Sequence, residues 1–283
     1  MNHTREKIMH AVFFLTACIS IISVIIICVF LFSSGIPAIA EIGLWDFLLG
    51  GVWKPANNLY GIFPMIVGSI YVTAGALVVG VPIGVLTAVF MARFCPEKIY
   101  KPLKSAVNLM AGIPSVVYGF FGLVVLVPFV RTHIGGFGMG VLTASVLLGL
   151  MILPTIISVS ESAIRAVPES YYEGGLALGA SHERSVFFTV LPAAKRGILA
   201  AVILGIGRAI GETMAVIMVA GNQAILPSSL TSGVRTLTTN IVIEMAYAAD
   251  KHREALIATA AVLFLFILAI NGIFLIVKRR TNN

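Results

Sequence analysis

Two oppositely charged residues, Arg208 and Glu212, lie in an otherwise uncharged apolar run from Gly197 to Ala220. If this run is one helix, their spacing of four places both side chains on the same helix face. The guanidinium offers a planar fork of donors that suits the oxygens of an anion, and an ionised Glu only accepts hydrogen bonds. Two interpretations are open: a charged station on the path of an anionic solute, or an internal ion pair that fixes helix packing. We favour the path, because Arg before Glu is the weaker order for a helical ion pair.

The composition indicates the environment of this run. Apolar residues make up 59% of the 283-residue chain, charged residues only 11%, and the mean hydropathy is +1.03, whereas soluble domains carry about a quarter charged residues. Six runs reach the roughly 20 residues that a membrane-crossing helix needs, and helices are the form that leaves no backbone group unpaired in lipid. The sequence therefore predicts an all-α integral membrane protein with six transmembrane helices. The runs are Ala11–Phe32, Met65–Ala92, Ser105–Val130, Met139–Ser160, Gly197–Ala220 and Ala255–Val277.

The placement of Lys and Arg predicts the orientation of these helices. Most of the 19 basic residues fall in the segments that share one side of the membrane with both chain ends, and cytoplasmic segments are the ones enriched in Lys and Arg. Both termini are therefore predicted to be cytoplasmic. The net charge of +7 reflects this bias and contact with anionic lipid, with no indication of a nucleic-acid partner.

We divide the chain into three parts by this topology. Residues 1–64 comprise a cytoplasmic tail, the first transmembrane helix and an outer interfacial segment, residues 65–277 a five-helix core with a cytoplasmic loop at 165–196, and residues 278–283 a second cytoplasmic tail. In the interfacial segment, Trp45 and Trp53 indicate a short helix that lies in the membrane interface. The 3 cysteines show no metal-ligand or disulfide spacing, so no metal site is predicted.

Pro114 interrupts the third apolar run, in the stretch AGIPSVVYGFFG. Proline removes one helical hydrogen bond and clashes with the preceding turn, which predicts a kink in this helix. Pro114 and Ser115 are therefore a candidate hinge, and the alternative is a static kink that only serves packing.

A polar interval, YYEGGLALGASHERSVFFTVLP at 171–192, separates the fourth and fifth runs. A proline at position 168 suits the start of a helix, Gly179 suits a helix end, and Ser181 can cap a following helix. The interval therefore predicts a short helix, a glycine turn and an amphipathic helix that is halted near Pro192.

The same interval resembles the EAA loop of binding-protein-dependent (MetI-like) ABC importer permeases, in which Glu-Ala-Ala, a Gly and Ile-x-Leu-Pro follow at fixed spacing. The matching residues here are Glu173, Gly174, Gly175, Gly179, Leu191 and Pro192. Glycines replace both alanines and Thr189 replaces the isoleucine, which preserves the small size and the spacing. The resemblance implies a type I ABC importer permease whose loop forms a coupling helix on a separate ATPase subunit. The alternative is an amphipathic loop without a partner.

The chain contains no phosphate-binding loop of the form G-x-x-x-x-G-K-[S/T]. In a member of this family, that absence implies a transport subunit that is not itself an enzyme and binds no cofactor. ATP and Mg²⁺ are then expected on two partner ATPase subunits.

Three longer stretches, GIPSVVYGFFGL, LPTIISVSESAIRAVP and GRAIGETMAVIMVAGN, are similar to the C-type permease subunits of phosphate-specific ABC importers, as is Trp53-Lys54-Pro55. This resemblance implies import of inorganic phosphate by alternating access across a bacterial or archaeal cytoplasmic (inner) membrane, with Arg208 and Glu212 on the substrate path. It implies as partners a sister permease subunit in a heterodimer, two ATPase subunits and an extracytoplasmic phosphate-binding protein. The alternatives within the family are the A-type sister subunit and a permease for sulfate or molybdate.

Two other classes of protein are weighed against the importer. A carrier that does not use ATP would keep Arg208 and Glu212 but leave the interval at 171–192 unexplained. A membrane enzyme acting on a phosphorylated lipid would combine Arg208 with Ser181-His182-Glu183, yet a loop cluster and a mid-membrane residue cannot reach one reacting atom. His182 is instead expected to be a solvated residue at the start of a helix.

Overall fold

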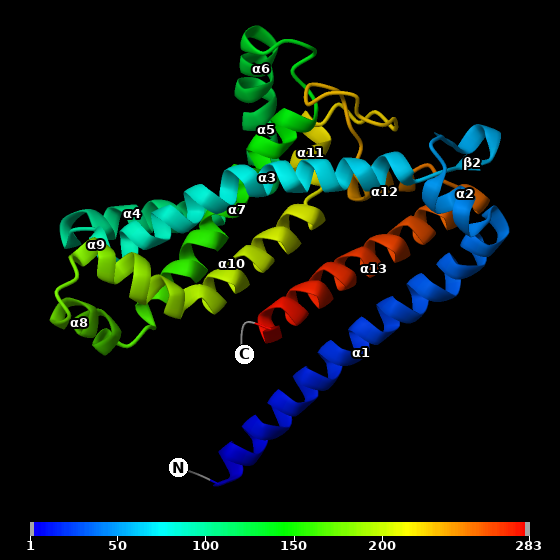
Figure 1. Cartoon of the computed structure of the whole chain (residues 1–283). Helices are drawn as coiled ribbons and strands as arrows, with labels where there is room; N and C mark the ends of the chain where they lie inside the picture. Colours follow the sequence, from blue (N-terminus) through cyan, green and yellow to red (C-terminus); the bar gives the residue numbers. More distant parts are fainter. Residues whose placement is uncertain (1–2, 281–283) are drawn as a thin grey trace.

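The computed structural model describes residues 3–280, with side chains described for residues 6–272, and helices dominate it (Figure 1). Within these residues, six helices are long and apolar enough to cross a membrane, which confirms the predicted fold class. The outermost parts of the two predicted tails, residues 1–2 and 281–283, lie outside the described residues. The six spans are Glu6–Ile42, Phe63–Phe94, Ser115–His133, Val141–Arg165, His182–Gly211 and Asp250–Gly272.

Several spans contain more than one element, because three of them include a π-helical turn. In chain order the elements are α1 (His3–Ile42), α2 (Leu44–Leu49), β1 (Trp53–Lys54), the 3₁₀ turn η1 (Pro55–Asn57), β2 (Leu59–Tyr60), α3 (Phe63–Val89), the π turn η2 (Phe90–Phe94), α4 (Glu97–Gly112), α5 (Ser115–Phe121), the π turn η3 (Gly122–Leu126), α6 (Val127–His133), α7 (Val141–Arg165), α8 (Glu169–Ala177), α9 (His182–Ser185), the π turn η4 (Val186–Val190), α10 (Leu191–Gly211), α11 (Met214–Val219), α12 (Leu237–Met245) and α13 (Asp250–Arg280).

The centre of the molecule is the pair α3 and α7, which run in the same direction and pack along their length. Glycines on α3 leave room for α7: a Cβ at Gly80 would lie 2.8 Å from the side chain of Ile152, and one at Gly84 would lie 2.7 Å from that of Ile156. Small residues four apart bring helix backbones together in this way. The two helices therefore form one tightly packed unit.

Helix α1 stands apart from this unit and lies antiparallel to α13 (Figure 1). The contact includes Phe32 and Phe264, whose rings are 6.0 Å apart in an edge-to-face arrangement. None of the most apolar stretch of α1 is buried, and the helix continues ten residues beyond the predicted end at Phe32. Both chain ends point away from the end of the molecule that carries α2 and the β1–β2 hairpin (Figure 1). We call this end the hairpin end; α8 lies at the opposite, or α8, end.

The short helix predicted between α1 and α3 is present as α2, and its place in the membrane interface stays a prediction, but Trp53 is not part of it. Trp45 lies on the short helix α2 and is 70% exposed, but Trp53 is buried in the hairpin. The indole of Trp53 donates a 2.8 Å hydrogen bond to Oε2 of Glu244 on α12, because a buried indole N–H needs an acceptor. Trp53 therefore fixes the hairpin to α12 and does not anchor the chain in lipid.

The third apolar run is two helices and not one kinked helix. Helix α4 ends at Gly112, Ile113 and Pro114 are extended, and α5 begins at Ser115. Proline disfavours helical geometry in the residue before it, and the Tyr118 hydroxyl donates to the carbonyl of Met110 across the gap at 2.9 Å. The predicted kink is thus a full break, and whether Pro114 and Ser115 act as a hinge stays a prediction.

Candidate functional site

The helix that carries Arg208 ends just after it, which overturns the prediction that Arg208 and Glu212 share one helix face. Helix α10 stops at Gly211, Glu212 has an extended backbone with ψ of 130°, and α11 begins at Met214. The Oε1 atom of Glu212 accepts a hydrogen bond from the backbone N–H of Ala215 at 3.2 Å. A side chain that takes a local backbone amide competes with helix continuation, so Glu212 begins a new helix where a single one was expected.

Arg208 remains on α10, and its side chain is half-buried. Its Nη1 donates to the Thr155 hydroxyl on α7 at 3.2 Å, and the guanidinium lies close enough to Tyr118 on α5 for an electrostatic interaction. Within residues 6–272, no ion pair joins Arg208 to Glu212. The internal ion pair that the sequence left open is therefore not formed in this structure.

The side of α10 next to these charges is open. A Cβ added at Gly207 or at Gly211 would meet no atom within 4 Å, so this pair of glycines does not serve helix packing within the chain. Leu204, one turn earlier, is 53% exposed. Arg208 and Glu212 thus border an unobstructed face on which a small anion can approach a fixed positive charge.

Helix α12 holds the broken segment from the hairpin end. The Thr238 hydroxyl donates to the carbonyl of Glu212 at 3.1 Å, and the neighbouring N–H of Leu237 donates to the Ser69 hydroxyl on α3 at 3.0 Å. Thr236 and Thr239 cap the start of α12 through a capping box. The first turn of α12 therefore joins α3 to the break beside Arg208. No local sequence pattern marks this contact, because its partners lie 26 and 168 residues apart in the chain.

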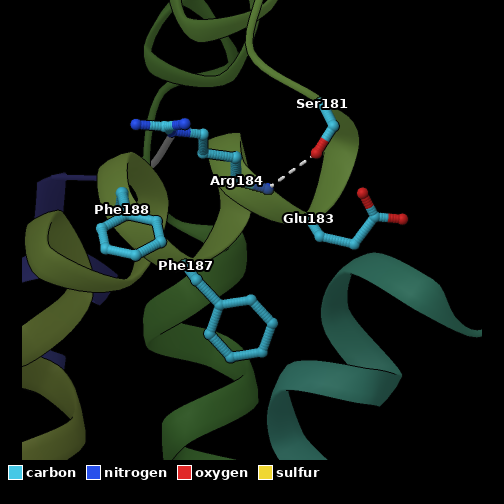
Figure 2. A pocket seen from close by; sticks show the side chains of 5 residues that line it. All are labelled: Ser181, Glu183, Arg184, Phe187 and Phe188. Carbon is cyan, nitrogen blue, oxygen red and sulfur yellow. Dashed lines mark hydrogen bonds between the residues drawn. The ribbon is translucent and has the colours of Figure 1, made fainter.

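The polar interval at the α8 end folds as the sequence predicts in its first half. Helix α8 is followed by Gly179, whose φ of 82° is the left-handed geometry that glycine favours at a helix end. The Ser181 hydroxyl then accepts the N–H of Arg184 at 3.3 Å and caps α9, as Figure 2 shows. A short helix, a glycine turn and a capped second helix are all present.

The predicted coupling residues on α8 divide into an exposed and a packed group. Glu173 and Gly174 are exposed, and a Cβ at Gly174 would meet no atom within 4 Å. At Gly175, by contrast, a Cβ would lie 2.7 Å from the Ser185 hydroxyl oxygen. The small residue at position 175 therefore lets α8 lie directly against α9.

The second half of the interval differs from the prediction, because Pro192 does not halt the helix. One continuous helical span runs from His182 to Gly211. Leu191 packs against the buried cluster below α8, and Pro192 lies in the first turn of α10. The π turn η4 precedes it, and a wider turn of this kind occurs mostly inside longer helices. Proline is tolerated in a first turn because its missing N–H is one that lacks a helical partner anyway.

Leu178 at the tip of the loop and Phe188 in the π turn η4 are exposed apolar residues that the motif did not single out. Leu178 is 91% exposed and Phe188 is 77% exposed. Phe188 and Phe187 line an open hollow together with Ser181, Glu183 and Arg184 (Figure 2). An apolar patch rimmed by charged residues is typical of a protein–protein contact. The position of Leu178, an apolar residue directly before the glycine turn of a polar loop, was the sequence signal for this exposed side chain.

His182 also differs from its prediction as a solvated residue. Its side chain is half-buried, and Nδ1 lies 2.7 Å from the Tyr172 hydroxyl. Along the continuous span to Arg208, 26 residues at 1.5 Å each separate the two by about 40 Å. The lipid-enzyme alternative, which needs both residues at one atom, therefore has no geometric support.

A buried carboxylate that sequence analysis missed lies toward the α8 end of α7. Glu161 is 2% exposed and accepts hydrogen bonds from Tyr100 and Lys104 of α4, each at 2.7 Å, and from Arg165 at 2.9 Å. The bond to the Glu161 carboxylate raises the pKa of the Tyr100 hydroxyl, which keeps it a donor. The spacing of four between Glu161 and Arg165 was the sequence signal for an ion pair on one helix face. The cluster fixes α4 on α7.

Replacing Glu161 with glutamine is expected to lower the free energy of unfolding by about 2 kcal/mol, because two cations lose the charge that compensates them. Thermal unfolding of the purified protein in detergent measures this. Glu41→Gln is the control: Glu41 is 60% exposed in its pair with Lys251, and such pairs contribute about 0–1 kcal/mol. Equal losses in the two variants would contradict a special role for Glu161.

No group of three or more His, Cys, Asp or Glu side chains is placed to hold a metal ion in the part of the chain that the structure describes. The candidate functional features are therefore two: the Arg208–Glu212 break with its open face, and the α8 loop with its exposed tip.

The fold is similar to that of chains in solved ABC transporters. The inward-facing MetNI methionine ABC transporter aligns with a TM-score of 0.58 and 21% identity, covering 81% of this chain and 99% of that one. A bacterial alginate ABC transporter in complex with a pentasaccharide-bound periplasmic protein aligns with a TM-score of 0.61 and 17% identity, covering 94% of both chains. At such identity these likenesses establish the fold alone.

Sequence comparison identifies closer relatives. The chain is 40% identical over 218 residues to the probable ABC transporter permease protein YqgH of Bacillus subtilis, covering 72% of this chain and 71% of the relative. It is 32% identical to the phosphate transport system permease protein PstC of Pasteurella multocida, covering 84% and 83% of the two chains. For the probable PstC of Methanocaldococcus jannaschii the identity is 31%, covering 89% and 87%.

The family model described as "Binding-protein-dependent transport system inner membrane component" matches residues 80–283, which include α4, the α8 loop and the Arg208–Glu212 break. The family to which the EAA-like interval pointed is thereby confirmed. This chain belongs to the binding-protein-dependent transport system inner membrane components, the permease subunits of ABC importers.

Proposed function

We propose that this chain is the C-type permease subunit of an ATP-driven importer of inorganic phosphate. The observation that carries the proposal is the Arg208 guanidinium, which lies beside an open face at a helix break without an ion pair to Glu212. Relatives that cover more than four fifths of the chain are named PstC, the phosphate transport system permease. These names favour the C-type subunit over its A-type sister and phosphate over sulfate or molybdate.

At the break, each charged group has a separate task toward phosphate. Arg208 binds the phosphate oxygens through its planar donors. The Glu212 carboxylate accepts a hydrogen bond from the hydroxyl that phosphate retains near neutral pH. It repels an anion that has no proton to donate. Within the described residues, the Glu212 carboxylate accepts one hydrogen bond, from the N–H of Ala215 to Oε1, and its second oxygen has acceptor capacity for the solute.

The α8 loop connects this path to ATP hydrolysis on other subunits. The exposed tip at Leu178 and Gly179 docks on an ATPase subunit, which holds ATP and Mg²⁺ and supplies the energy for alternating access. The α8 end and both chain termini then face the cytoplasm across the inner membrane, as the basic residues predict. A sister permease completes the membrane-spanning heterodimer, a second ATPase subunit docks on it, and an extracytoplasmic phosphate-binding protein delivers solute at the hairpin end.

Reconstitution of the complex in proteoliposomes tests this proposal. We expect uptake of radiolabelled phosphate that requires ATP, the ATPase subunits and the binding protein together. Uptake that continues without ATP would identify a carrier instead. Uptake of sulfate or molybdate in preference to phosphate would reassign the substrate within the same family.

Glu212→Gln is expected to weaken discrimination between phosphate and sulfate by about tenfold, since neutralising the carboxylate removes the repulsion of a fully deprotonated anion and about 1.4 kcal/mol corresponds to tenfold. Competition by sulfate against the binding of radiolabelled phosphate to the purified complex measures this. The binding protein is left out of the assay, so that it does not select the anion first. Unchanged sulfate exclusion in this assay would rule out Glu212 as the discriminating group.

A further inference from the structure

Arg93, at the end of the span that begins with α3, holds the coupling helix α8. Its Nη1 donates to Oε2 of Glu169 at 2.8 Å, and its guanidinium lies 5.7 Å from the centre of the Tyr172 ring. The Arg93 side chain is 12% exposed, compared with 58% for Glu169. Helix α8 is therefore bound to the end of the α3 span, although helices α4 to α7 lie between the two in the sequence.

The neighbouring residue Phe94 contacts the second helix of the loop. The Phe94 ring meets the edge of His182 at 4.7 Å and lies 6.3 Å from Phe187, measured between ring centres. His182 is in turn 2.7 Å from the Tyr172 hydroxyl. Both halves of the loop thus lie on the same two residues, which we call the Arg93–Phe94 clamp.

Two features of the clamp are suited to a second arrangement. Arg93 and Phe94 lie in the π turn η2, and Phe187 lies in the π turn η4; π turns within helices are found frequently at functional sites. The Nε atom of Arg93 is buried without a hydrogen-bond partner, although buried donors are nearly always paired. This donor is therefore available for a second partner in another arrangement of α8.

The other end of α3 reaches the break at Glu212. Ser69 on α3 accepts the N–H of Leu237 at the start of α12, and a Cβ at Gly68 would lie only 2.5 Å from the carbonyl oxygen of Arg235. Thr238, one residue further along α12, donates to the carbonyl of Glu212. Helix α3 therefore touches the coupling loop at one end and the support of the solute site at the other.

We propose that α3 transmits the displacement of α8 to the Glu212 break, and that Arg93 is the positioning residue at which the displacement enters α3. This inference rests on the proposed docking of α8 on an ATPase. The packed unit of α3 and α7 moves as one body, because the Gly80 and Gly84 contacts leave no space for sliding. The motion then passes through α12 to the carbonyl of Glu212. Such a contiguous chain of packed groups is a physical route for coupling between distant sites.

Arg93→Gln in the reconstituted complex tests the clamp. We expect phosphate taken up per ATP hydrolysed to fall about fivefold, within the range that substitutions along a coupling network produce, while the hydrolysis rate stays within about twofold of the wild type. Glu169→Gln should lower the ratio in the same direction, and the double variant should be no worse than Arg93→Gln alone, because Arg93→Gln already breaks the contact with Glu169. Arg93→Lys, which keeps the charge, should restore most of the ratio.

The exposed residue Lys98, five positions along the chain, provides the matched control. Lys98→Gln removes the same positive charge from the same end of the molecule and should leave the ratio unchanged. Equal losses of uptake and hydrolysis in Arg93→Gln, or an equal loss of the ratio in Lys98→Gln, would overturn the proposal.

A second measurement does not depend on the substrate. A fluorophore is attached at Tyr247→Cys, just beyond α12 and 67% exposed, with Cys18, Cys28 and Cys95 replaced by serine. Trapping the ATPase with ATP and vanadate should change the emission in the wild type and not in Arg93→Gln. If the complex moves no phosphate but this difference appears, the proposed substrate is wrong and the clamp stands. A response that persists in Arg93→Gln, or that is absent from the wild type, overturns the clamp.

Discussion

Arg208→Gln is expected to lower ATP-dependent phosphate uptake about 30-fold or more in a complex that still assembles and hydrolyses ATP. Removing one partner of a desolvated charge contact costs about 2 kcal/mol or more, which corresponds to about 30-fold in the population of the bound state. Glutamine keeps a hydrogen bond to Thr155 within reach and preserves most of the side-chain volume. The loss therefore isolates the charge from the packing of α10 on α7.

Two companion variants give this result its meaning. Arg208→Lys keeps the charge without the planar fork of donors and should fall between the wild type and Arg208→Gln. Arg131→Gln removes an exposed positive charge from α6 and should transport normally. Undiminished uptake by Arg208→Gln would show that Arg208 is a packing residue bound to Thr155, and it would remove the main structural argument for an anionic substrate.

The second large effect is expected at the tip of the coupling loop. Leu178→Asp should weaken co-purification with the ATPase subunit about 30-fold, because Leu178 is 91% exposed in this chain and a central apolar anchor contributes about 2 kcal/mol or more to an interface. An aspartate in the same position would also have to be desolvated. Affinity capture of the ATPase by detergent-solubilised permease, at several ATPase concentrations, measures the change.

Ser170→Asp is the matched control for the Leu178 variant. Ser170 lies in the first turn of α8 and is exposed, whereas Leu178 directly follows the last turn, so the substitution introduces the same charge at the opposite end of the helix from the tip. Both variants should insert in the membrane and melt at the wild-type temperature. Equal capture of the ATPase by Leu178→Asp and the wild type would exclude the tip of the loop as the docking point.

Features that depend on local sequence could be predicted well. Hydropathy identified all six spans, since an apolar stretch long enough to cross a bilayer has few alternatives. The turn at Gly179 and the cap at Ser181 were also predictable, because both are set by the residue itself and its nearest neighbours. Arg208 could also be predicted as a functional candidate, because a charged residue within an apolar membrane span is costly and usually has a function.

Features that depend on distant partners could not be read in this way. The break after Gly211 involves the Glu212 carboxylate and a hydroxyl from Thr238, which is 26 residues away. Trp53 resembles an interfacial anchor in sequence, but its indole donates to Glu244 on α12, which is 191 residues away. Glu161 lies one residue beyond the predicted run Met139–Ser160, and its partners Tyr100 and Lys104 come from α4, 61 and 57 residues earlier in the chain. In each case a side chain far along the chain decides the role of the residue.

The position of α1 has a consequence for how this chain can change over generations. None of its most apolar stretch is buried, so within this chain natural selection acts there on hydrophobicity far more than on side-chain shape. Exchanges among Leu, Ile, Val and Phe there should be almost neutral, whereas a single added methyl group at Gly80 or Gly84 meets the side chains of α7. Among related chains, we therefore expect the apolar stretch of α1 to vary in sequence more than α3 and α7 do.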